Sequence, residues 1–361
     1  HSGSSLTVPN VLWRGMGARR GSARAAAVSP QKRCFMIKFR SPDINDIPAL
    51  ARVFSAYRGE ICDMTPANVV MWRSYYGTEL AFEKTADGGE ALYLRYAVDP
   101  DIDPDSFPDA RARAYAHSYA YACPKVFYPG DDKTADRIAH ADEVRAAVER
   151  LVAEGAHFFC CLSWDERALI LTVCPEAEVW QDRDWNDYIY DAEKMISLGG
   201  KHLAGQRNHI NKFKSLYPEW RTEAICEENI PAARAFLDAY YAGLRAEGKT
   251  DAVFDAERGA IDEVLSNWRA YGQEGILLYA GDRIAAFTFG EVVAGMLDIH
   301  IEKADRVFQG AYPMVFREFA ARFAGRAVTV NREEDCGEPG LRQSKLAYHP
   351  VRLAEKYNMV L

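Results

Sequence analysis

The amino-acid sequence predicts a mixed α/β protein built from two halves that repeat one order of secondary-structure elements. Short apolar segments, several with alternating polar residues, indicate strands, and they are interspersed with segments of helical spacing. Each half gives the same order: a strand, two helices, three strands, a helix and a strand. The two halves share negligible sequence identity, so the predicted repeat depends on the order of elements alone.

The first half follows this order between residues 36 and 174, with 168–174 as one further strand at its end. Its helices are predicted at 44–59, 65–78 and 141–155, the last ending at Gly155. Strands are predicted at 36–43, 79–84, 90–98, 125–129, 157–164 and 168–174. The segment 99–115 is rich in Pro and Asp and is therefore predicted to be a loop.

The second half repeats the order between residues 221 and 331. Helices are predicted at 228–248, 255–272 and 311–325, and strands at 221–226, 275–280, 283–292, 296–302 and 327–331. Gly281 and Asp282 are a good turn pair for a hairpin between two of these strands. This order is the core of the GNAT (acyl-CoA N-acyltransferase) fold. The expected architecture is therefore an α/β protein of two tandem GNAT-like domains.

The expected domains are an N-terminal one at 36–183 and a C-terminal one at 221–361, joined by a basic helical segment at 184–220. In that segment we expect a loop, a helix, a Gly-Gly break and a second helix from about Ala204. Residues 1–35 differ from the rest because they hold six basic residues and no acidic one. We expect them to be a leader or tag without regular structure, with a targeting peptide as the alternative.

Composition narrows the class of protein. The 361 residues are 48% hydrophobic and 27% charged, which suits a globular protein with a sizeable core. No apolar run reaches the roughly 18 to 20 residues that a membrane-spanning helix needs. The eight cysteines are scattered without a CxxC pair, so we expect a reducing, cytoplasmic compartment, peripheral membrane association as an alternative, and no metal site.

The charge balance argues against a general nucleic-acid binder. Without the six basic residues of 1–35 the net charge changes from −8 to −14. We therefore expect no DNA binding, and any contact with RNA requires a local basic patch. One such patch is predicted between Lys194 and Pro218, where no acidic residue occurs. Its candidate phosphate-binding residues are Lys201, Arg207, Asn208 and Lys212; a merely solvated helix face is the simpler interpretation.

The predicted strand at 296–302 carries the candidate catalytic groups. Alternation places Leu297, Ile299 and Ile301 on one face, and the titratable residues Asp298, His300 and Glu302 on the other. A histidine within reach of a carboxylate is a common proton-transfer pair. The alternative is a solvated sheet face.

A candidate cofactor loop follows this strand. Gln309 and Gly310 precede a predicted helix whose N-terminal N–H groups could bind an anion. GNAT enzymes that use acetyl-CoA carry Q/R-x-x-G-x-G/A here, but Gly310 lies four residues after Arg306 instead of three. This departure puts a CoA thioester donor in doubt.

The stretch "VNREEDCGEPGLRQSKLAYHP" (330–350) places many opposed charges at the end of a predicted strand. Gly337 and Gly340 allow a tight turn that brings both sets of charges together. We expect substrate-binding residues here: Glu333, Glu334, Asp335, Arg342, Lys345 and Tyr348. The simpler interpretation is a buried ion-pair network, which fixes one arrangement without adding much stability.

Taken together, four segments resemble the C-terminal domain family of phosphatidylglycerol lysyltransferases (LPG synthases). They are 187–213, "HIEKAD", "QGAY" and 330–357. The resemblance is to the stand-alone soluble branch and extends from about Met36 to Tyr357. It implies two tandem GNAT-like domains related to the Fem-type aminoacyltransferases. The large transmembrane flippase region of the full-length enzymes has no counterpart in this sequence.

The resemblance implies transfer of an aminoacyl group from aminoacyl-tRNA to a lipid headgroup or an amine. No cofactor is assigned. Aminoacyl-tRNA is the expected donor, and a CoA thioester is the alternative. The expected acceptor is an anionic lipid headgroup or a small amine. In this hypothesis Glu302 or His300 is the base and Glu334 or Asp335 binds the ammonium group. Arg207, Arg342 and Lys345 contact phosphate. An acetyl-CoA-dependent N-acetyltransferase and a non-catalytic binding protein for anionic ligands stay open as alternatives.

Overall fold

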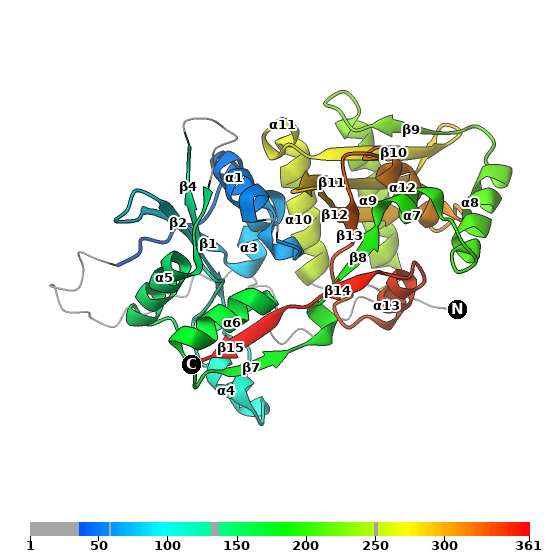
Figure 1. The fold of residues 1–361 in the computed structure, drawn as a ribbon. Helices are drawn as coiled ribbons and strands as arrows, with labels where there is room; N and C mark the ends of the chain where they lie inside the picture. Colours follow the sequence, from blue (N-terminus) through cyan, green and yellow to red (C-terminus); the bar gives the residue numbers. More distant parts are fainter. Residues whose placement is uncertain (1–35, 58, 131–136, 249–251) are drawn as a thin grey trace. The chain divides into compact units, whose positions relative to one another are not determined.

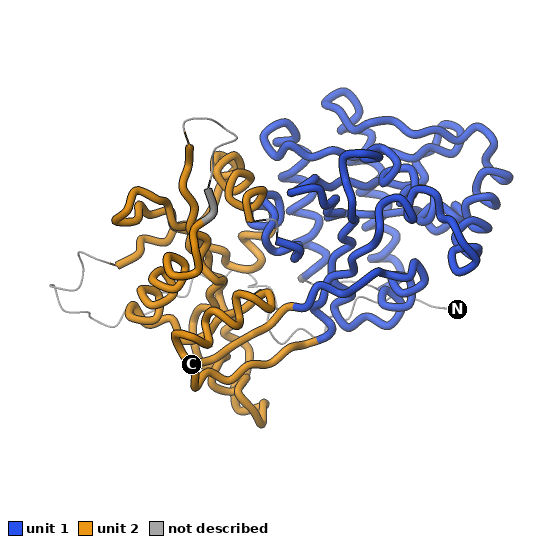
Figure 2. The backbone as a smooth tube through the Cα atoms, viewed as in Figure 1, with its two compact units in different colours: residues 1–9, 58–71, 183–355 blue, residues 10–57, 72–182, 356–361 orange. Residues whose placement is uncertain are grey.

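The computed structural model describes residues 36–57, 59–130, 137–248 and 252–361. The leader expected at 1–35 lies outside these residues. Figure 2 shows two compact units. Of the described residues, 59–71 and 183–355 form unit 1, whereas 36–57, 72–182 and 356–361 form unit 2. The expected division differs at two places. It assigns 59–71 to the N-terminal domain and 356–361 to the C-terminal domain, whereas these segments belong to unit 1 and unit 2, respectively.

Unit 2 contains a mixed sheet with the strand order β5-β4-β2-β3-β6-β15-β7, and β1 pairs with β2. Figure 1 labels β1, β2, β4, β7 and β15 of this sheet. The strands are β1 Glu79–Lys84, β2 Glu90–Ala97, β3 Tyr119–Tyr121, β4 Lys125–Tyr128, β5 Arg137–Ile138, β6 Phe158–Leu162, β7 Glu178–Gln181 and β15 Tyr357–Val360. The helices are α1 Ile47–Tyr57, α3 Arg73–Tyr76, α4 Ala110–Tyr115, α5 Ala141–Ala153 and α6 Trp164–Val173. Its core includes Leu151, Phe159 and Met359.

Unit 1 contains the sheet β14-β8-β13-β12-β11-β10-β9, in which β12 and β13 are parallel and the other pairs antiparallel. The strands are β8 Asp187–Asp191, β9 Trp220–Ala224, β10 Glu274–Ala280, β11 Arg283–Val293, β12 Met296–Ala304, β13 Thr329–Asn331 and β14 Arg352–Ala354. The helices are α2 Pro66–Met71, α7 Ala192–Ser197, α8 Ala204–Leu216, α9 Ile230–Ala246, α10 Ala252–Ser266, α11 Trp268–Tyr271, α12 Ala311–Ala321 and α13 Pro339–Leu346. The two mixed sheets confirm the predicted α/β fold.

Several expected elements differ from the structure, each for a local reason. The strand expected at 168–174 is wrong: residues 168–173 belong to α6, which Ser163 and Glu166 begin with a reciprocal capping box. The segment 99–115 is not all loop, because Asp109 caps the short helix α4. At 36–43 only an isolated bridge, Arg40 to Leu80, is present. Conversely, β8 forms where a loop was expected.

A β-bulge in β12 decides which side chains reach each face of the unit 1 sheet. On β11, the neighbours Phe289 and Gly290 pair with Ile301 and Ile299, so His300 is the extra residue. The alternation shifts by one residue at this point. Asp298 and His300 lie on one face, whereas the next acidic residue, Glu302, lies on the other. The expectation that all three share a face is therefore wrong.

The two faces have different coverings. Leu297 and Ile299 pack into the core that α7, α8 and α12 form with one face of the sheet. The other face carries Phe289, whose ring meets Trp268 of α11 edge-on at 5.9 Å between centroids. On the same side Lys303 pairs with Glu257 of α10. This second face, on which Asp298 and His300 lie, also receives the segment 59–71.

Gly290 is required by the bulge, and we predict that Gly290→Ala destabilises the protein. A Cβ at this position would lie 2.0 Å from the carbonyl oxygen of Asp298. Because backbone atoms cannot move aside cheaply, the expected loss in the free energy of unfolding is about 3 kcal/mol or more. The matched control is Gly243→Ala in α9, where nothing lies within 4 Å of the added atom. Urea unfolding should show the control unchanged or stabilised by about 0.5–1 kcal/mol; equal effects of the two substitutions would refute the bulge.

Candidate functional site

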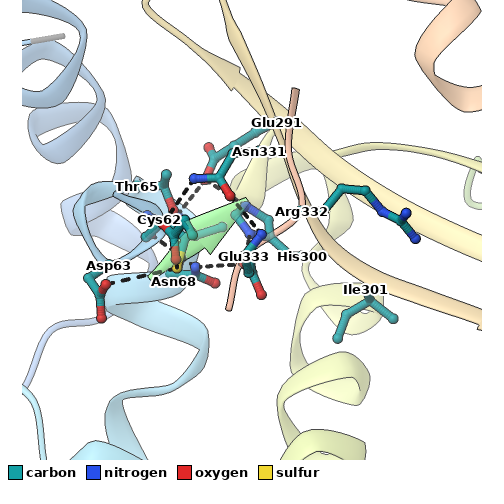
Figure 3. Close-up of polar contacts among 12 residues, drawn as sticks. Cys62, Asp63, Thr65, Asn68, Glu291, His300, Ile301, Asn331, Arg332 and Glu333 are labelled. Carbon is teal, nitrogen blue, oxygen red and sulfur yellow. Dashed lines mark hydrogen bonds and ion pairs between the residues drawn. The ribbon is translucent and has the colours of Figure 1, made fainter. Parts of the chain in front are cut away.

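A histidine held between two carboxylates forms the centre of the candidate site (Figure 3). His300 Nε2 lies 3.1 Å from Oε1 of Glu291, and its Nδ1 lies 3.0 Å from Oε1 of Glu333. The imidazole is completely buried, whereas 11% of the Glu291 side chain and 21% of the Glu333 side chain are exposed. These residues come from three separate places: β11, the bulge of β12 and the segment that follows β13.

The segment 59–71 fixes the two carboxylates. The backbone N–H of Ala67 donates to Glu291 Oε1 at 2.9 Å, and Asn68 Nδ2 donates to Glu333 Oε1 at 3.0 Å. Both oxygens that contact His300 therefore accept a second hydrogen bond. Glu333 itself has a left-handed backbone (φ 58°), and its N–H donates to the side chain of Asn331. Figure 3 shows Arg332, between them in sequence, pointing away from this cluster.

The environment makes His300 a cation. Burial alone would lower the pKa of His300, but hydrogen bonds and charge from Glu291 and Glu333 outweigh burial and raise the pKa to about 10. At neutral pH both ring nitrogens then carry protons and donate one hydrogen bond to each carboxylate. His300 is in this state a donor and a positioning group.

Asp298 has the opposite character. It is fully buried, and neither of its carboxylate oxygens has a hydrogen-bond partner among the described residues. Burial, and then the negative charges of Glu291, Asp187 and Glu333, raise the pKa of Asp298 well above its ordinary value, although His300 acts in the opposite direction. A buried, unpaired carboxyl group is costly, which makes Asp298 an unusual feature of this face.

Glu302, expected in the same group, lies on the α12 side of the sheet. Its Oε1 accepts a hydrogen bond from Arg332 at 2.8 Å, and the guanidinium of Arg332 stacks over the rings of Phe316 and Tyr348. Burial raises the pKa of Glu302, while Arg332 lowers it. Tyr348 is buried and contacts Tyr190 and Phe316.

Most of the charged side chains of 330–350, here called the terminal motif, form contacts that hold this segment in place. Lys345 is buried and donates to the carbonyl oxygens of Arg332, Glu333 and Glu334, and burial lowers its pKa. Asp335 is also buried, and its carboxylate accepts hydrogen bonds from Arg342, Tyr188 and Arg183. Burial would raise the pKa of Asp335, but these donors lower it to about 2. The ion-pair network offered as the simpler interpretation is thus present around Asp335.

Some of the residues expected to bind phosphate are engaged in packing, and others are exposed. Arg207 donates to the carbonyl oxygens of Leu198 and Gly200 and so supports the turn before α8. Lys201, Asn208 and Lys212 are exposed. Gln309 is exposed as well, whereas Gly310 begins α12 with a left-handed backbone against α8, where an added Cβ would lie 2.3 Å from the His209 carbonyl oxygen.

Sequence reasoning missed four residues of this face: Cys62, Asn68, Asp187 and Glu291. The first two lie in a segment assigned to the N-terminal half, and Asp187 lies in a strand expected to be a loop. Glu291 offered a weak signal, since it is an acidic residue in a hydrophobic strand directly after Gly290. None of these positions is marked by spacing, because the chain brings them together only in the tertiary fold.

Comparisons with solved structures identify the class of fold. A conserved protein of unknown function from Bacteroides thetaiotaomicron superposes with a TM-score of 0.73 at 28% identity, over 90% of this chain and 100% of that one. The C-terminal domain of a protein described as a lysylphosphatidylglycerol synthetase, from Agrobacterium fabrum, superposes with a TM-score of 0.55 at 15% identity, over 87% and 92% of the two chains. The two likenesses agree with the mixed α/β fold of two sheets described above.

The family follows from the sequence itself. The sequence model of "Phosphatidylglycerol lysyltransferase, C-terminal" matches residues 55–360, and the chain belongs to this family. An uncharacterised protein of Mycoplasmoides gallisepticum is 23% identical over 175 residues, which is 47% of this chain and 54% of that protein. The chain thus matches about half the length of this relative. Within the described residues, no helix is long and apolar enough to cross a membrane.

We predict that the charged state of His300 makes the protein less stable at high pH. The folded-state pKa of about 10 lies above the ordinary value of 6.5. The contribution of His300 to stability is therefore full below about pH 6.5 and is lost as pH rises through about 10. Urea unfolding between pH 6 and 10.5 should show a smaller decline for His300→Gln than for the wild type. His209→Gln, at an exposed position of α8, should follow the wild type; a parallel decline in His300→Gln would contradict the assignment.

We also predict that Lys345→Met destabilises the protein through the motif backbone. The substitution leaves three carbonyl oxygens without their charged donor, so the free energy of unfolding should fall by about 3 kcal/mol. Lys212→Met, at an exposed position of α8, should change it by less than about 0.5 kcal/mol. Thermal unfolding of both variants provides the measurement, and a Lys345 variant as stable as the Lys212 variant would show that the donor is dispensable.

Proposed function

We propose that this protein is a GNAT-like acyltransferase that transfers an aminoacyl group from aminoacyl-tRNA to a lipid headgroup or an amine. Family membership and fold support the broader class, an acyltransferase related to lysylphosphatidylglycerol synthesis. The donor and the acceptor belong to the proposal. They rest on the family description and on the chemistry of the sheet face that carries Asp298 and His300.

The observation that carries the proposal is the position of Glu333 and His300 in the sheet. The parallel strands β12 and β13 pair only from Met296 with Thr329 to Asp298 with Asn331. Beyond this point β12 continues to Ala304, whereas β13 ends and the chain turns at Glu333. In GNAT folds the acyl donor lies beside the corresponding strand. The position of the cluster beside β12 supports the assignment of this face to the acyl group.

Glu333 is the residue that we assign to proton transfer. Its side-chain contacts with His300 and Asn68 both use Oε1, so Oε2 is left for the acceptor. The acceptor hydroxyl or amine passes its proton to Glu333 as it attacks the ester carbonyl carbon. The tetrahedral intermediate then expels the ribose oxygen of the tRNA, which takes up that proton. The His300 imidazolium positions Glu333. This assignment replaces Glu302 or His300 as base, because Glu302 is engaged by Arg332 on the opposite face.

The charge of the surroundings agrees with an aminoacyl substrate. Glu291, Glu333 and Asp298 lie near His300, and this excess of carboxyl groups favours the ammonium group of an aminoacyl donor over an acyl group without charge. Near α8, the exposed side chains of Lys201, Asn208 and Lys212 are available for phosphate groups of RNA or of a lipid. Arg342 and Lys345 are assigned to the motif and not to the substrate, since their donors are engaged by Asp335 and by backbone carbonyl groups.

A CoA thioester is the second candidate donor, favoured by Gly310 at the start of α12. The close approach of α8 accounts for this glycine by packing alone. The two donors are distinguished by thermal-shift measurements with CoA and by product analysis with aminoacyl-tRNA. A rise in melting temperature with CoA, together with acyl transfer from a CoA thioester, would replace the aminoacyl-tRNA proposal.

The direct test incubates the protein with lysyl-tRNA and vesicles containing phosphatidylglycerol, and measures aminoacylated lipid by mass spectrometry. Glu333→Gln should reduce the rate by about 10²–10⁴-fold, because it removes the proton acceptor. The control Glu219→Gln makes the same charge change at an exposed position of unit 1 and should keep the wild-type rate. A Glu333 variant that folds and retains full activity would exclude this residue as base. Absence of product with a panel of aminoacyl-tRNAs and with amine acceptors would refute the transfer reaction.

A further inference from the structure

A second cluster of donor atoms lies on the same sheet face, apart from the groups assigned to transfer. It consists of the thiol of Cys62 and the carboxylates of Asp187 and Glu334, whose donor atoms lie within 4.8 Å of one another. Cys62 Sγ is 3.5 Å from Oδ1 of Asp187 and 3.3 Å from Oε2 of Glu334. Cys62 and Asp187 are buried, and Glu334 is half-buried. These separations suit ligands that share one small cation.

Hydrogen bonds from neighbouring residues orient one of these ligands, Asp187. The backbone N–H of Cys62 donates to Oδ2 of Asp187 at 2.6 Å, and Asn331 Nδ2 donates to the same oxygen at 3.0 Å. With Oδ2 held in this way, Oδ1 is the oxygen that faces the thiol. Asn331 is in turn fixed by its bond to the carbonyl oxygen of Glu60. Hydrogen bonds of this kind to the non-ligating oxygen are what orients carboxylates in metal sites.

Asp298 gives an independent indication that this face binds a cation. Its carboxyl group is fully buried, and both oxygens lack a partner among the described residues. It pairs in register with Asn331, which binds Asp187, so it faces the cluster from the neighbouring strand. A buried carboxyl group without any donor is rare and requires an explanation. A positive ion on this face supplies one.

We propose that Cys62, Asp187 and Glu334 bind a divalent transition-metal ion of the zinc type. A thiolate with two carboxylates is a donor set that suits zinc, whereas magnesium and calcium prefer oxygen ligands alone. Three protein ligands leave a coordination position open, and Asp298 lies on the same face to complete or orient the set. Binding replaces the thiol proton of Cys62 by the metal, so one proton is released for each ion bound at this residue.

This inference does not depend on the proposed transfer reaction. The site uses none of the residues assigned to proton transfer, and its occupancy is measured without any substrate. It also goes against the expectation from the sequence, which offered no metal-ligand spacing because Cys62 lies 125 residues from Asp187 and 272 residues from Glu334 along the chain. Only the tertiary fold brings them together.

The test uses the full chain, first stripped with a chelator and then titrated with Zn²⁺ or with Co²⁺ as a spectroscopic probe. Wild-type protein should bind one equivalent, and Co²⁺ should produce the ultraviolet charge-transfer band of a cobalt–thiolate bond. Cys62→Ser should abolish that band, and Glu334→Gln should weaken Zn²⁺ binding by at least about 100-fold. Cys226→Ser removes an exposed thiol of unit 1 and should leave both readouts unchanged.

Circular dichroism establishes that each variant is folded. If Cys62→Ser fails to fold, the cobalt spectrum of the Cys226→Ser protein together with the affinity of Glu334→Gln decides the question. The proposal is overturned if wild-type protein binds no stoichiometric metal. It is also overturned if the cobalt–thiolate band is absent, or if Glu334→Gln binds as tightly as the wild type. In those cases Cys62 is only a thiol hydrogen-bonded to carboxylates.

Discussion

The β-bulge at His300 is the constraint on which the rest of the site depends. Without the extra residue, β12 would keep strict alternation, and Glu302 would share a face with Asp298. The bulge instead turns Glu302 toward Arg332 and α12, and leaves His300 opposite Glu291 and Glu333. Gly290 makes this possible, because only a residue without a side chain fits against the Asp298 carbonyl oxygen. One inserted residue thereby separates a structural ion pair from the candidate site.

The buried charges of unit 1 fall into two groups with different consequences. Arg332, Arg342 and Lys345 are bound by carboxylates and backbone carbonyl groups, so they fix the segment after β13 in one conformation. On the other face, Glu291 and Glu333 bind the His300 imidazolium, and the carboxyl groups of Asp187, Asp298 and Glu334 lie on the same side. An arrangement of this kind is poised to bind positive charge, whether an ammonium group or a metal ion.

The sequence predicted much of this fold but only part of the site. Strands such as 296–302 and helices such as 141–155 carry strong periodicity, and they are present in the structure. The strand expected at 168–174 is absent, because Ser163 and Glu166 cap a helix that includes most of this apolar segment. The segment 59–71 packs in unit 1 although the residues on either side of it belong to unit 2, and β12 has a bulge at His300. Both features arise from tertiary packing and leave no local pattern in the sequence. Consequently the sequence does not predict Cys62 and Asn68. It predicts Lys345 as a ligand-binding residue, whereas in the structure Lys345 donates to three backbone carbonyl oxygens.

The central claim is that His300 is an imidazolium clamped between two carboxylates. Nitrogen-15 NMR of the imidazole ring, in protein labelled at histidine, reports the protonation of each ring nitrogen directly. At pH 7.5 the account predicts that both nitrogens of His300 are protonated, and that the signals change only as pH approaches about 10. A neutral tautomer with one unprotonated nitrogen at pH 7.5 would contradict it, and would return His300 to the role of a general base.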